Sequence, residues 1–398
     1  MFHIEQNTPP PSFALSELGF RPFFTAASLF AIVAIGIWMA EYFFSPLWVQ
    51  APIGSMHWHG HEMIFGYTMA VIAGFLLTAV GNWTGQPGLR GPALLGLVGL
   101  WLIARLAYFV PVPATLTVSA AADSLFTLGL IAAVALPVVR VRQWHQLWIL
   151  VILALLLFSN LYVHMGWQGY AGDGIRQGLY LGLYVVLALI FAIARRVLPF
   201  FIERGVGGNF QPVNRRWVDI GSMALFLVWA VTDVFLQQSD WVAALSVGLL
   251  VLHGVRLRDW YTPAIVKVPL LWSLYAGYGF LLLGFLLKVL SPWLAIPPTL
   301  ALHAFAFGGI GLITLSMMSR VSLGHTGRSV FEPPTSVQFM FYLLVLGALA
   351  RVVAPILSPS HYPVWIATSQ SLWILGFMLF AFIYLPMLVR PRIDGKRG

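Results

Sequence analysis

Cysteine and charged residues are what this 398-residue chain has least of: it contains no cysteine, and only 9% of its residues are charged. A soluble domain would carry about a quarter charged residues, so the composition excludes an ordinary soluble fold. The lack of cysteine excludes disulfides, thiolate-ligated iron–sulfur clusters and cysteine-based zinc sites. With 60% hydrophobic residues, the chain is predicted to be a membrane protein with many spanning segments.

Acidic residues are also scarcer than basic ones, with 13 Asp and Glu against 22 Lys and Arg and a net charge of +9. In a membrane protein, such an excess is typical of basic loops on the cytoplasmic side rather than of nucleic-acid binding. We therefore expect membrane lipid, and no nucleic acid, among the partners of this protein.

Apolar runs of about 17 to 25 residues predict transmembrane helices. About twelve can be counted, at residues 23–44, 57–80, 93–110, 116–139, 144–165, 175–202, 217–237, 240–256, 268–290, 297–319, 336–357 and 362–389. No soluble domain fits between them, so residues 1–398 are expected to form one all-α bundle in the membrane. Residues 1–22 would be an N-terminal segment and residues 390–398 a short tail.

The placement of Lys and Arg predicts the orientation of the bundle. If the chain starts on the inside and the helices alternate, all but four of the 22 basic residues fall on the inside. Arg176 and Lys288 fall outside, while Arg105 and Arg351 lie within apolar segments. Because basic loops stay cytoplasmic, we expect both termini to be cytoplasmic.

The densest chemistry lies in the sequence HWHGHE at residues 57–62, at the outer, periplasmic end of the second predicted helix. Polar groups at membrane depth are costly unless they are paired or bind a ligand. The cluster therefore indicates a metal or haem site, the alternative being a hydrated surface loop. On a helix, His57 and His61 share one face and His59 points away; in a loop, all three could bind one ion. Glu62 is the expected catalytic proton donor, or the group that orients a ligating histidine.

A further histidine, His303, is predicted about two turns below the outer face. The segments that begin at His61 and His303 share the pattern H-x-x-x-F-G, and a Thr-Gly pair follows at the same distance in both. This internal echo predicts equal depth for the two histidines. Small residues near both make room for a flat cofactor or for close helix packing. The alternative for His303 is a hydrogen-bonded histidine in the core.

Arg105 and Arg351 are predicted near the outer ends of their helices, where an unpaired guanidinium would cost several kcal/mol. Haem propionates would be suitable counter-ions, because Arg pairs with carboxylates through two hydrogen bonds. The alternative is pairing within the protein, with Glu62, Asp123 or Asp233. Asp123, Asp233 and His164 fall in the same outer layer, but sequence does not show whether these groups converge.

On the cytoplasmic side, His325 stands out because it lies in the turn-prone sequence GHTGR at residues 324–328. It is predicted to be a second haem or metal ligand, or an anchor of the loop. His145 is expected at the surface and His253 at a helix end. His3 and His361 have no supporting context and are expected to be exposed.

Three stretches of the chain resemble the NnrS family, bacterial haem- and copper-containing membrane proteins linked to nitric oxide. They are LGFRPFF at residues 18–24, HWHGHEMIFGYTMAVIAGFLLTAVGNWTG at 57–85 and LHAFAFGGIGLITLSMMSRVSLGHTGR at 302–328. The resemblance implies about twelve spanning helices in a bacterial inner (plasma) membrane, haem b, copper and a role in resisting nitrosative stress. It does not assign individual histidines to cofactors.

Three functions follow as hypotheses. In the first, the protein binds nitric oxide and reduces it to N2O with electrons from membrane quinol. His61 and His303 would then bind haem iron, supported by Arg105, Arg351 and His325. His57 and His59 would bind copper or a second centre, and Glu62 would deliver protons. In the second, the protein is a secondary transporter, which twelve helices with scattered Gly and Pro also fit. In the third, it is a nitric oxide sensor or a haem- and copper-handling protein without catalysis.

Overall fold

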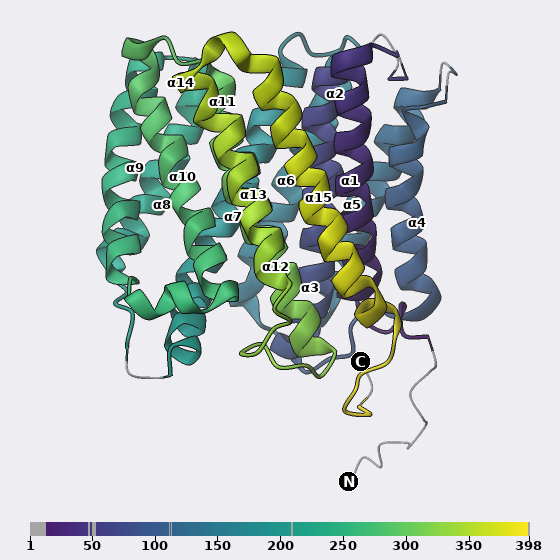
Figure 1. Ribbon diagram of the computed structural model, residues 1–398. Coiled ribbons are helices and arrows are strands. Elements are labelled where there is room, and N and C mark those ends of the chain that lie inside the picture. Colours follow the sequence, from purple (N-terminus) through teal and green to yellow (C-terminus); the bar gives the residue numbers. More distant parts are fainter. Residues whose placement is uncertain are drawn as a thin grey trace.

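The structure is a computed structural model that describes residues 13–46, 48–49, 53–110, 112, 114–207 and 210–396. Within these residues every regular element is helical and there is no strand. Long helices run roughly parallel to one another from one end of the bundle to the other (Figure 1). The predicted all-α membrane bundle is therefore confirmed.

Twelve helical spans cross the bundle in the described part of the chain, as the apolar runs predicted. Eleven are long and apolar enough to cross a membrane, and Gly91–Ala107 is a shorter apolar helix of 17 residues. The spans are α1 (Phe20–Phe44), α2–η1–α3 (Ser55–His61, Glu62–Thr68, Met69–Thr84), α4 (Gly91–Ala107), α5 (Thr115–Arg140), α6 (Leu147–Trp167), α7 (Gly174–Gly205), α8–η3 (Arg216–Val231, Thr232–Leu236), α9 (Ser239–Asp259), α10 (Pro269–Leu294), α11–η5–α12 (Pro298–His303, Ala304–Gly311, Leu312–His325), α13 (Val337–Val352) with α14 (Ala354–Leu357), and α15 (Tyr362–Val389). Short 3-10 turns at Trp144–Gln146, Pro263–Lys267 and Pro359–His361 join some of them.

The internal echo in the sequence corresponds to a repeated structure. A π-helical segment directly follows His61 and another directly follows His303. Both spans end at a Thr-Gly pair whose glycine has positive φ, +65° at Gly85 and +81° at Gly327. His61 lies six residues into its span and His303 five residues into its own. At about 1.5 Å per helical residue, the two histidines therefore lie at similar depth.

These two spans form the centre of the bundle and are its two most deeply buried. Their glycines permit close packing: a Cβ at Gly308 would lie 2.4 Å from Phe280, and one at Gly311 would lie 2.6 Å from Trp373. These glycines thus allow close helix packing, one of the two roles predicted for the small residues near His303. Around this centre α1 packs against α3 and α15, so the first and last helices lie side by side (Figure 1).

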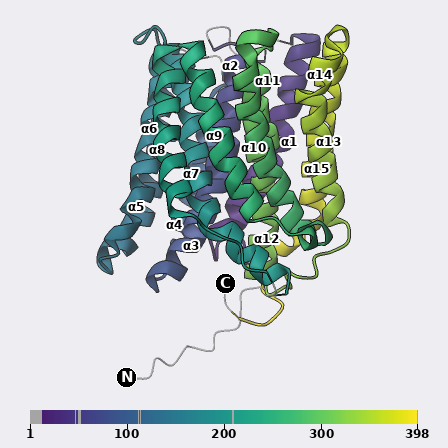
Figure 2. The same ribbon diagram turned by 90° about the vertical axis from the view of Figure 1, so that its left-hand side faces the viewer.

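Helix α1 begins and α15 ends at one end of the bundle, hereafter the terminal face; α2 and α11 begin at the opposite end, hereafter the histidine face (Figures 1 and 2). The predicted N-terminal segment 1–22 is too long, because α1 begins at Phe20. Arg21 is fully buried and donates hydrogen bonds to the carbonyls of Leu388 (2.7 Å) and Arg390 (2.8 Å) at the end of α15. A cation there complements the helix dipole. Residues 1–12, including His3, lie outside the described residues.

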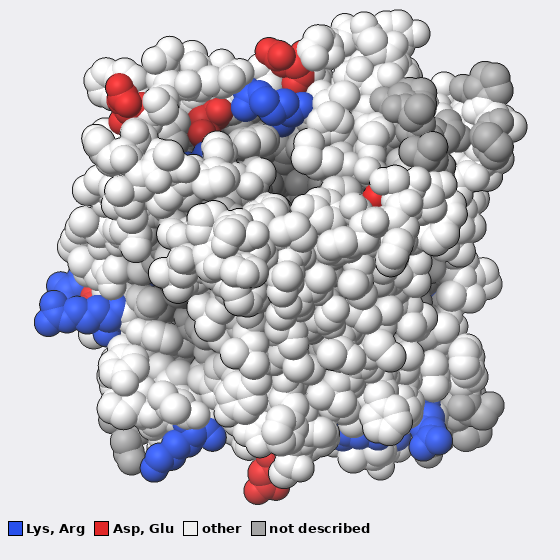
Figure 3. Space-filling model, turned by 45° about the horizontal axis from the view of Figure 1, so that its top comes forward, with Lys and Arg blue, Asp and Glu red and all other residues white. Residues whose placement is uncertain are grey.

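The flank of the bundle is almost uncharged. In the face that Figure 3 shows, Lys, Arg, Asp and Glu gather mainly toward the two ends, and the area between them is nearly free of charge. Many large apolar side chains are exposed along the spanning helices, among them Leu125 on α5, Val151 on α6 and Phe382 on α15. Because exposed apolar surface of this extent is stable only in hydrocarbon, the flank is suited to contact lipid.

Candidate functional site

Helix α2 sets the directions of the three clustered histidines. It begins before His57, so the three lie on a helix and the predicted loop alternative is excluded. Successive helical residues are about 100° apart, and His59 and His61 accordingly contact different neighbours. The His59 ring stacks on Trp38 of α1, with ring centroids 5.0 Å apart, whereas the His61 ring lies 5.3 Å from that of His164 on α6.

His61 belongs to a buried group of ionisable side chains near the histidine face, which we call the acidic cluster. Its members are His61, Glu62, Arg105, Asp123 and His164, from α2, η1, α4, α5 and α6, and each is at most 2% exposed. The Nδ1 atom of His61 lies 2.8 Å from Oε1 of Glu62, and its Nε2 atom lies 2.8 Å from Oδ1 of Asn160. The sequence placed these groups in one layer, and the structure shows that they converge.

Arg105 joins the two carboxylates of the acidic cluster. Its Nε lies 2.7 Å from Oε2 of Glu62, and one terminal nitrogen donates to both oxygens of Asp123 at 2.6 and 2.7 Å. The other terminal nitrogen donates to the carbonyl of Phe65 at 2.9 Å. A π-helical turn leaves carbonyls without their usual helical donor, and here Arg105 supplies one. Of the two predicted kinds of partner for Arg105, the structure shows the carboxylates of the protein, Glu62 and Asp123.

His164 has no hydrogen-bond partner for either ring nitrogen among the described residues, although both nitrogens are buried. Its Nε2 lies 3.7 Å from Oδ2 of Asp123, which is too far for a hydrogen bond. One ligand atom from each of His61, Asp123 and His164 lies within 4.8 Å of the other two. Buried polar atoms without partners are costly, so the arrangement suits a bound metal ion.

The charge of the acidic cluster leads to the same conclusion. Glu62 and Asp123 contribute two negative charges and Arg105 one positive charge, which leaves a net charge of −1 when both histidines are neutral. A net charge buried away from water is strongly unfavourable. A proton on a histidine or a metal cation between His61, Asp123 and His164 would balance it.

His59 pairs with His303 across the centre of the bundle. Their rings are nearly parallel, at 13°, with centroids 6.4 Å apart. Nδ1 of His303 lies 2.7 Å from the carbonyl of Thr299 and must donate to it, so the lone pair is on Nε2. Nδ1 of His59 is buried and has no partner among the described residues. Both rings therefore have a nitrogen free to bind a ligand, and the predicted alternative of a hydrogen-bonded histidine accounts for Nδ1 of His303 only.

Arg351 lies beside this pair, close enough for its charge to act on both His59 and His303. Its one side-chain partner among the described residues is Tyr362, whose hydroxyl lies 3.4 Å from a terminal nitrogen and whose ring faces the guanidinium. In the described part of the chain, no carboxylate lies within ion-pair distance of Arg351. Asp233, one of the partners considered for it, instead binds Lys288 at 2.8 Å. The surroundings of His59 and His303 are therefore positively charged and lack an anion.

The remaining predicted ligands lie apart from these groups. His57 is partly exposed and has no hydrogen bond or ring contact among the described residues. His61 and His303, predicted to bind one haem, are divided between the acidic cluster and the His59–His303 pair. His325 lies at the terminal face, where its ring packs against Phe20 and its carbonyl accepts a hydrogen bond from Arg392. This contact corresponds to the loop-anchor interpretation of His325.

The same end of the chain is fixed by an ion pair in the tail. Arg392 donates to both carboxylate oxygens of Asp394, at 2.6 and 2.8 Å, and these hydrogen bonds lower the pKa of Asp394. The amide of Ile393 donates to the carbonyl of Thr326. The tail predicted at residues 390–398 thus packs on the turn after α12 over its described residues.

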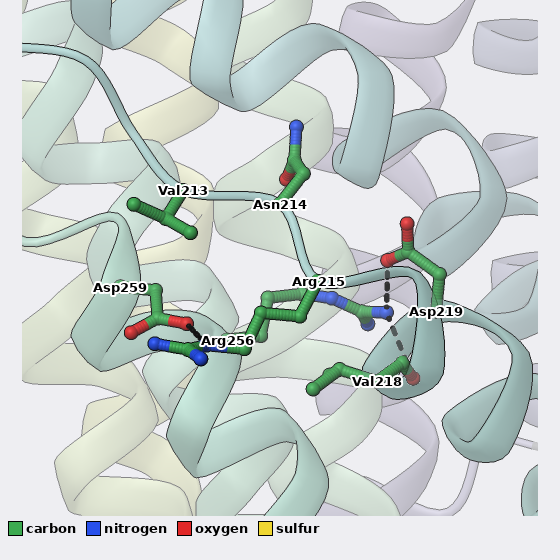
Figure 4. Close-up of a pocket in the computed structure, with 7 residues that line it drawn as sticks. All are labelled: Val213, Asn214, Arg215, Val218, Asp219, Arg256 and Asp259. Atoms are coloured by element: carbon green, nitrogen blue, oxygen red, sulfur yellow. Dashed lines mark hydrogen bonds and ion pairs between the residues drawn. The ribbon is translucent and has the colours of Figure 1, made fainter.

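His253 and the pocket beside it are structural. Nδ1 of His253 accepts hydrogen bonds from Arg256 (3.0 Å) and from the Tyr278 hydroxyl (2.6 Å), which occupy its lone pair. The ring proton is therefore on Nε2, which is buried and has no partner among the described residues. A pocket of about 160 Å³ at the terminal face contains the other end of this network (Figure 4). There Arg256 binds Asp219 at 2.8 Å, and the neighbouring carboxylate, Asp259, accepts a hydrogen bond from Arg215. Both carboxylates are paired, so this pocket is not a metal site.

Three residues of this site, Asp123, Asn160 and His164, were not among the ligands predicted from the sequence. His164 was placed in the outer layer, but nothing in its neighbourhood resembles a ligand motif. Asn160 lies one turn earlier on α6, and this i, i+4 spacing puts both side chains on one face. That spacing, together with a histidine at the end of an apolar helix, is the feature of the sequence that could have indicated a polar site on this face of α6.

Comparison with known proteins supports one family. The family model described as NnrS protein matches residues 14–392, which is almost the whole chain. No curated protein matches the chain. The matched range contains the acidic cluster, the His59–His303 pair and all twelve spans. The chain therefore belongs to the NnrS family.

Proposed function

We propose that this protein is a haem b- and copper-containing membrane protein that binds nitric oxide and takes part in the response to nitrosative stress. The observation that carries the proposal is two histidine sites of opposite charge at the histidine face, the buried acidic cluster and the partly buried His59–His303 pair. One lacks an anion and the other lacks a cation, which are the two charges that haem propionates and a copper ion supply. The proposed location is the periplasmic side of the inner membrane.

The His59–His303 pair fits the haem. His59 and His303 would hold the haem iron through ring nitrogens that have no partner among the described residues, and their ring centroids lie 6.4 Å apart. The hydrogen bond from His303 to the Thr299 carbonyl fixes the tautomer of the ring and would leave Nε2 to bind the iron. Arg351 would hold a propionate, which supplies the missing anion.

The acidic cluster fits the copper ion. His61, His164 and Asp123 would be its ligands, since their ligand atoms already lie within 4.8 Å of one another. A monovalent copper ion would neutralise the net charge of the cluster. Glu62 would accept the Nδ1 hydrogen of His61 and thus orient the ring. This assignment replaces the pairing of His61 with His303 that the sequence predicted.

If the protein also turns nitric oxide over, two NO, two electrons and two protons give one N2O and one water. Bound haem would supply a centre that binds nitric oxide, and membrane quinol is the proposed electron source. Glu62 lies between His61 and Arg105, where it would pass a proton within the acidic cluster. The buried position of the cluster would exclude bulk water from this region.

The test is to purify the protein in detergent and to measure iron, copper and the reduced-minus-oxidised spectrum, with and without nitric oxide. We expect His303→Ala to lose the haem band and keep copper. We expect His164→Ala to lose copper and keep the haem band. His361→Ala, at an exposed histidine, is the matched control and should keep both. Loss of haem in His164→Ala but not in His303→Ala would contradict the assignment, and a colourless, metal-free protein would contradict the function.

A further inference from the structure

An apolar crevice of about 690 Å³ opens between α1, α3, α7 and α12, away from both histidine sites. Its walls are formed by apolar side chains such as Phe24, Phe75, Ile193 and Met317. The one hydroxyl group in the lining, that of Thr314, already donates to the carbonyl of Ile310 at 2.6 Å and accepts from Tyr67 at 2.7 Å. The crevice therefore suits a hydrocarbon chain.

Arg320 lies directly beyond this crevice, toward the terminal face. It follows the lining residue Met317 by three positions on α12, and Phe201 follows the lining residue Leu198 by three positions on α7, so each lies about one turn further along its helix. The Cζ atom of Arg320 lies 3.7 Å from the centroid of the Phe201 ring. The two residues thus lie together beyond the terminal-face end of the crevice.

The guanidinium of Arg320 lacks an anion. Arg320 is only 9% exposed, yet no hydrogen bond or ion pair to it is found in the described part of the chain. Its contact with Phe201 is a cation–π interaction, which attracts the charge without neutralising it. Buried arginines in membrane proteins are usually paired, so Arg320 indicates a ligand that carries a negative charge.

We propose that the crevice binds one anionic phospholipid, with an acyl chain between α3, α7 and α12 and the phosphate on Arg320. Arginine binds phosphate through two parallel hydrogen bonds. Arg320 lies five residues before the end of α12 at His325, or about 7.5 Å along the helix, which is the depth of the headgroup region. Basic pockets between helices at this depth are suited to anionic headgroups.

Charge favours a phospholipid over a quinol at this site. A quinol has an apolar tail that would also fit the crevice, but its head is neutral and would leave the Arg320 charge unbalanced. Further basic residues, Arg196 and Arg204, lie on the adjoining part of α7. They raise the local positive potential, which attracts an anionic headgroup.

The experiment is native mass spectrometry of the full-length protein in detergent, first as purified and then after delipidation and titration with phosphatidylglycerol. We expect one tightly held phosphatidylglycerol, and about 10- to 100-fold weaker binding in Arg320→Gln, since a hydrogen-bonded charge is lost. Arg320→Lys should recover part of the affinity. Ala194→Leu, which fills the crevice wall, should weaken binding while leaving the charge in place.

Arg140→Gln, at an exposed arginine on the terminal side of α5, is the matched control and should bind as the parent does. Size-exclusion profiles and the copper content show whether each variant is folded. Equal phosphatidylglycerol binding in Arg320→Gln would overturn the proposal, as would unchanged binding in Ala194→Leu. A quinone that co-purifies with the parent and is lost from Arg320→Gln would also overturn it, in favour of a quinol site.

Discussion

Replacing Arg105 should destabilise the protein by more than the loss of a single hydrogen bond. Arg105 is 2% exposed and lies within 2.7 Å of both Glu62 and Asp123. Arg105→Gln leaves these two carboxylates buried without a permanent cation. Breaking a buried ion pair by removing one partner costs about 3–5 kcal/mol, and we expect a loss of that size in the copper-free protein.

The double variant Arg105→Gln/Asp123→Asn tests the cause of this loss. It removes one of the two stranded charges, while Glu62 keeps its hydrogen bond to His61. The double variant should therefore be more stable than Arg105→Gln alone, because its unpaired charge is smaller. A loss caused only by altered packing would instead add up over the two changes.

The assay is equilibrium unfolding by SDS in mixed micelles, on copper-free protein, with haem absorbance as a second reading. An Arg105→Gln protein as stable as the parent would refute the reasoning, as would a double variant less stable than the single one. Full stability together with loss of haem would show that Arg105 binds a propionate instead of the two carboxylates.

Three further predictions concern packing, capping and metal binding. Gly66→Ala should cost about 1–3 kcal/mol of unfolding free energy, because its Cβ would lie 2.6 Å from Phe30. Gly36→Ala is the control and should be neutral, because its Cβ would meet nothing within 4 Å. Unfolding in mixed micelles measures both variants, and equal stabilities would contradict the close contact of Gly66 with Phe30. Arg21→Gln should cost about 1.5–3 kcal/mol of unfolding free energy, because it loses the hydrogen bonds to the end of α15. Arg140→Gln, at an exposed arginine, should cost nothing. The same assay measures both, and an Arg21→Gln protein as stable as the parent would refute the capping role of Arg21. Copper at about 100 times its dissociation constant should stabilise the parent protein by about 2.7 kcal/mol. It should not stabilise the His164→Ala variant. A rise in the melting temperature of that variant with copper would argue against His164 as a ligand.

Composition and hydropathy were sufficient to predict the bundle, because spanning helices must be long and apolar. All twelve predicted spans occur, although α1 starts three residues earlier than predicted, since Arg21 is buried by hydrogen bonds that no sequence pattern announces. The orientation of the termini across the membrane stays a prediction. The echo at His61 and His303 also corresponds to a repeated structure, since both are followed by π-helical segments.

Which helices contact one another could not be predicted from the sequence. Depth follows from position along a helix, but which helices are neighbours depends on packing across the whole bundle. His61 and His303 have similar depth and similar motifs, yet one faces α6 and the other faces α2. Likewise, the sequence left two kinds of partner open for Arg105, a haem propionate or a carboxylate of the protein. The packing of α4 against α5 brings Arg105 to Asp123.

The π-helical segment η1 should determine both sites at once, because it sets the rotation of α2. A π-helical segment amounts to an α-helix with one inserted residue, so deleting Met63 should let Glu62–Thr68 return to an α-helix. Helix α2 would then turn by about 100° relative to α3, and His59 and His61 would both leave their partners. We expect this deletion to lose haem and copper together, measured by absorbance and metal analysis, whereas deletion of Glu332 in the exposed loop after α12 should lose neither. Retention of either cofactor after deletion of Met63 would show that α2 is positioned by its other contacts rather than by the π-helical turn.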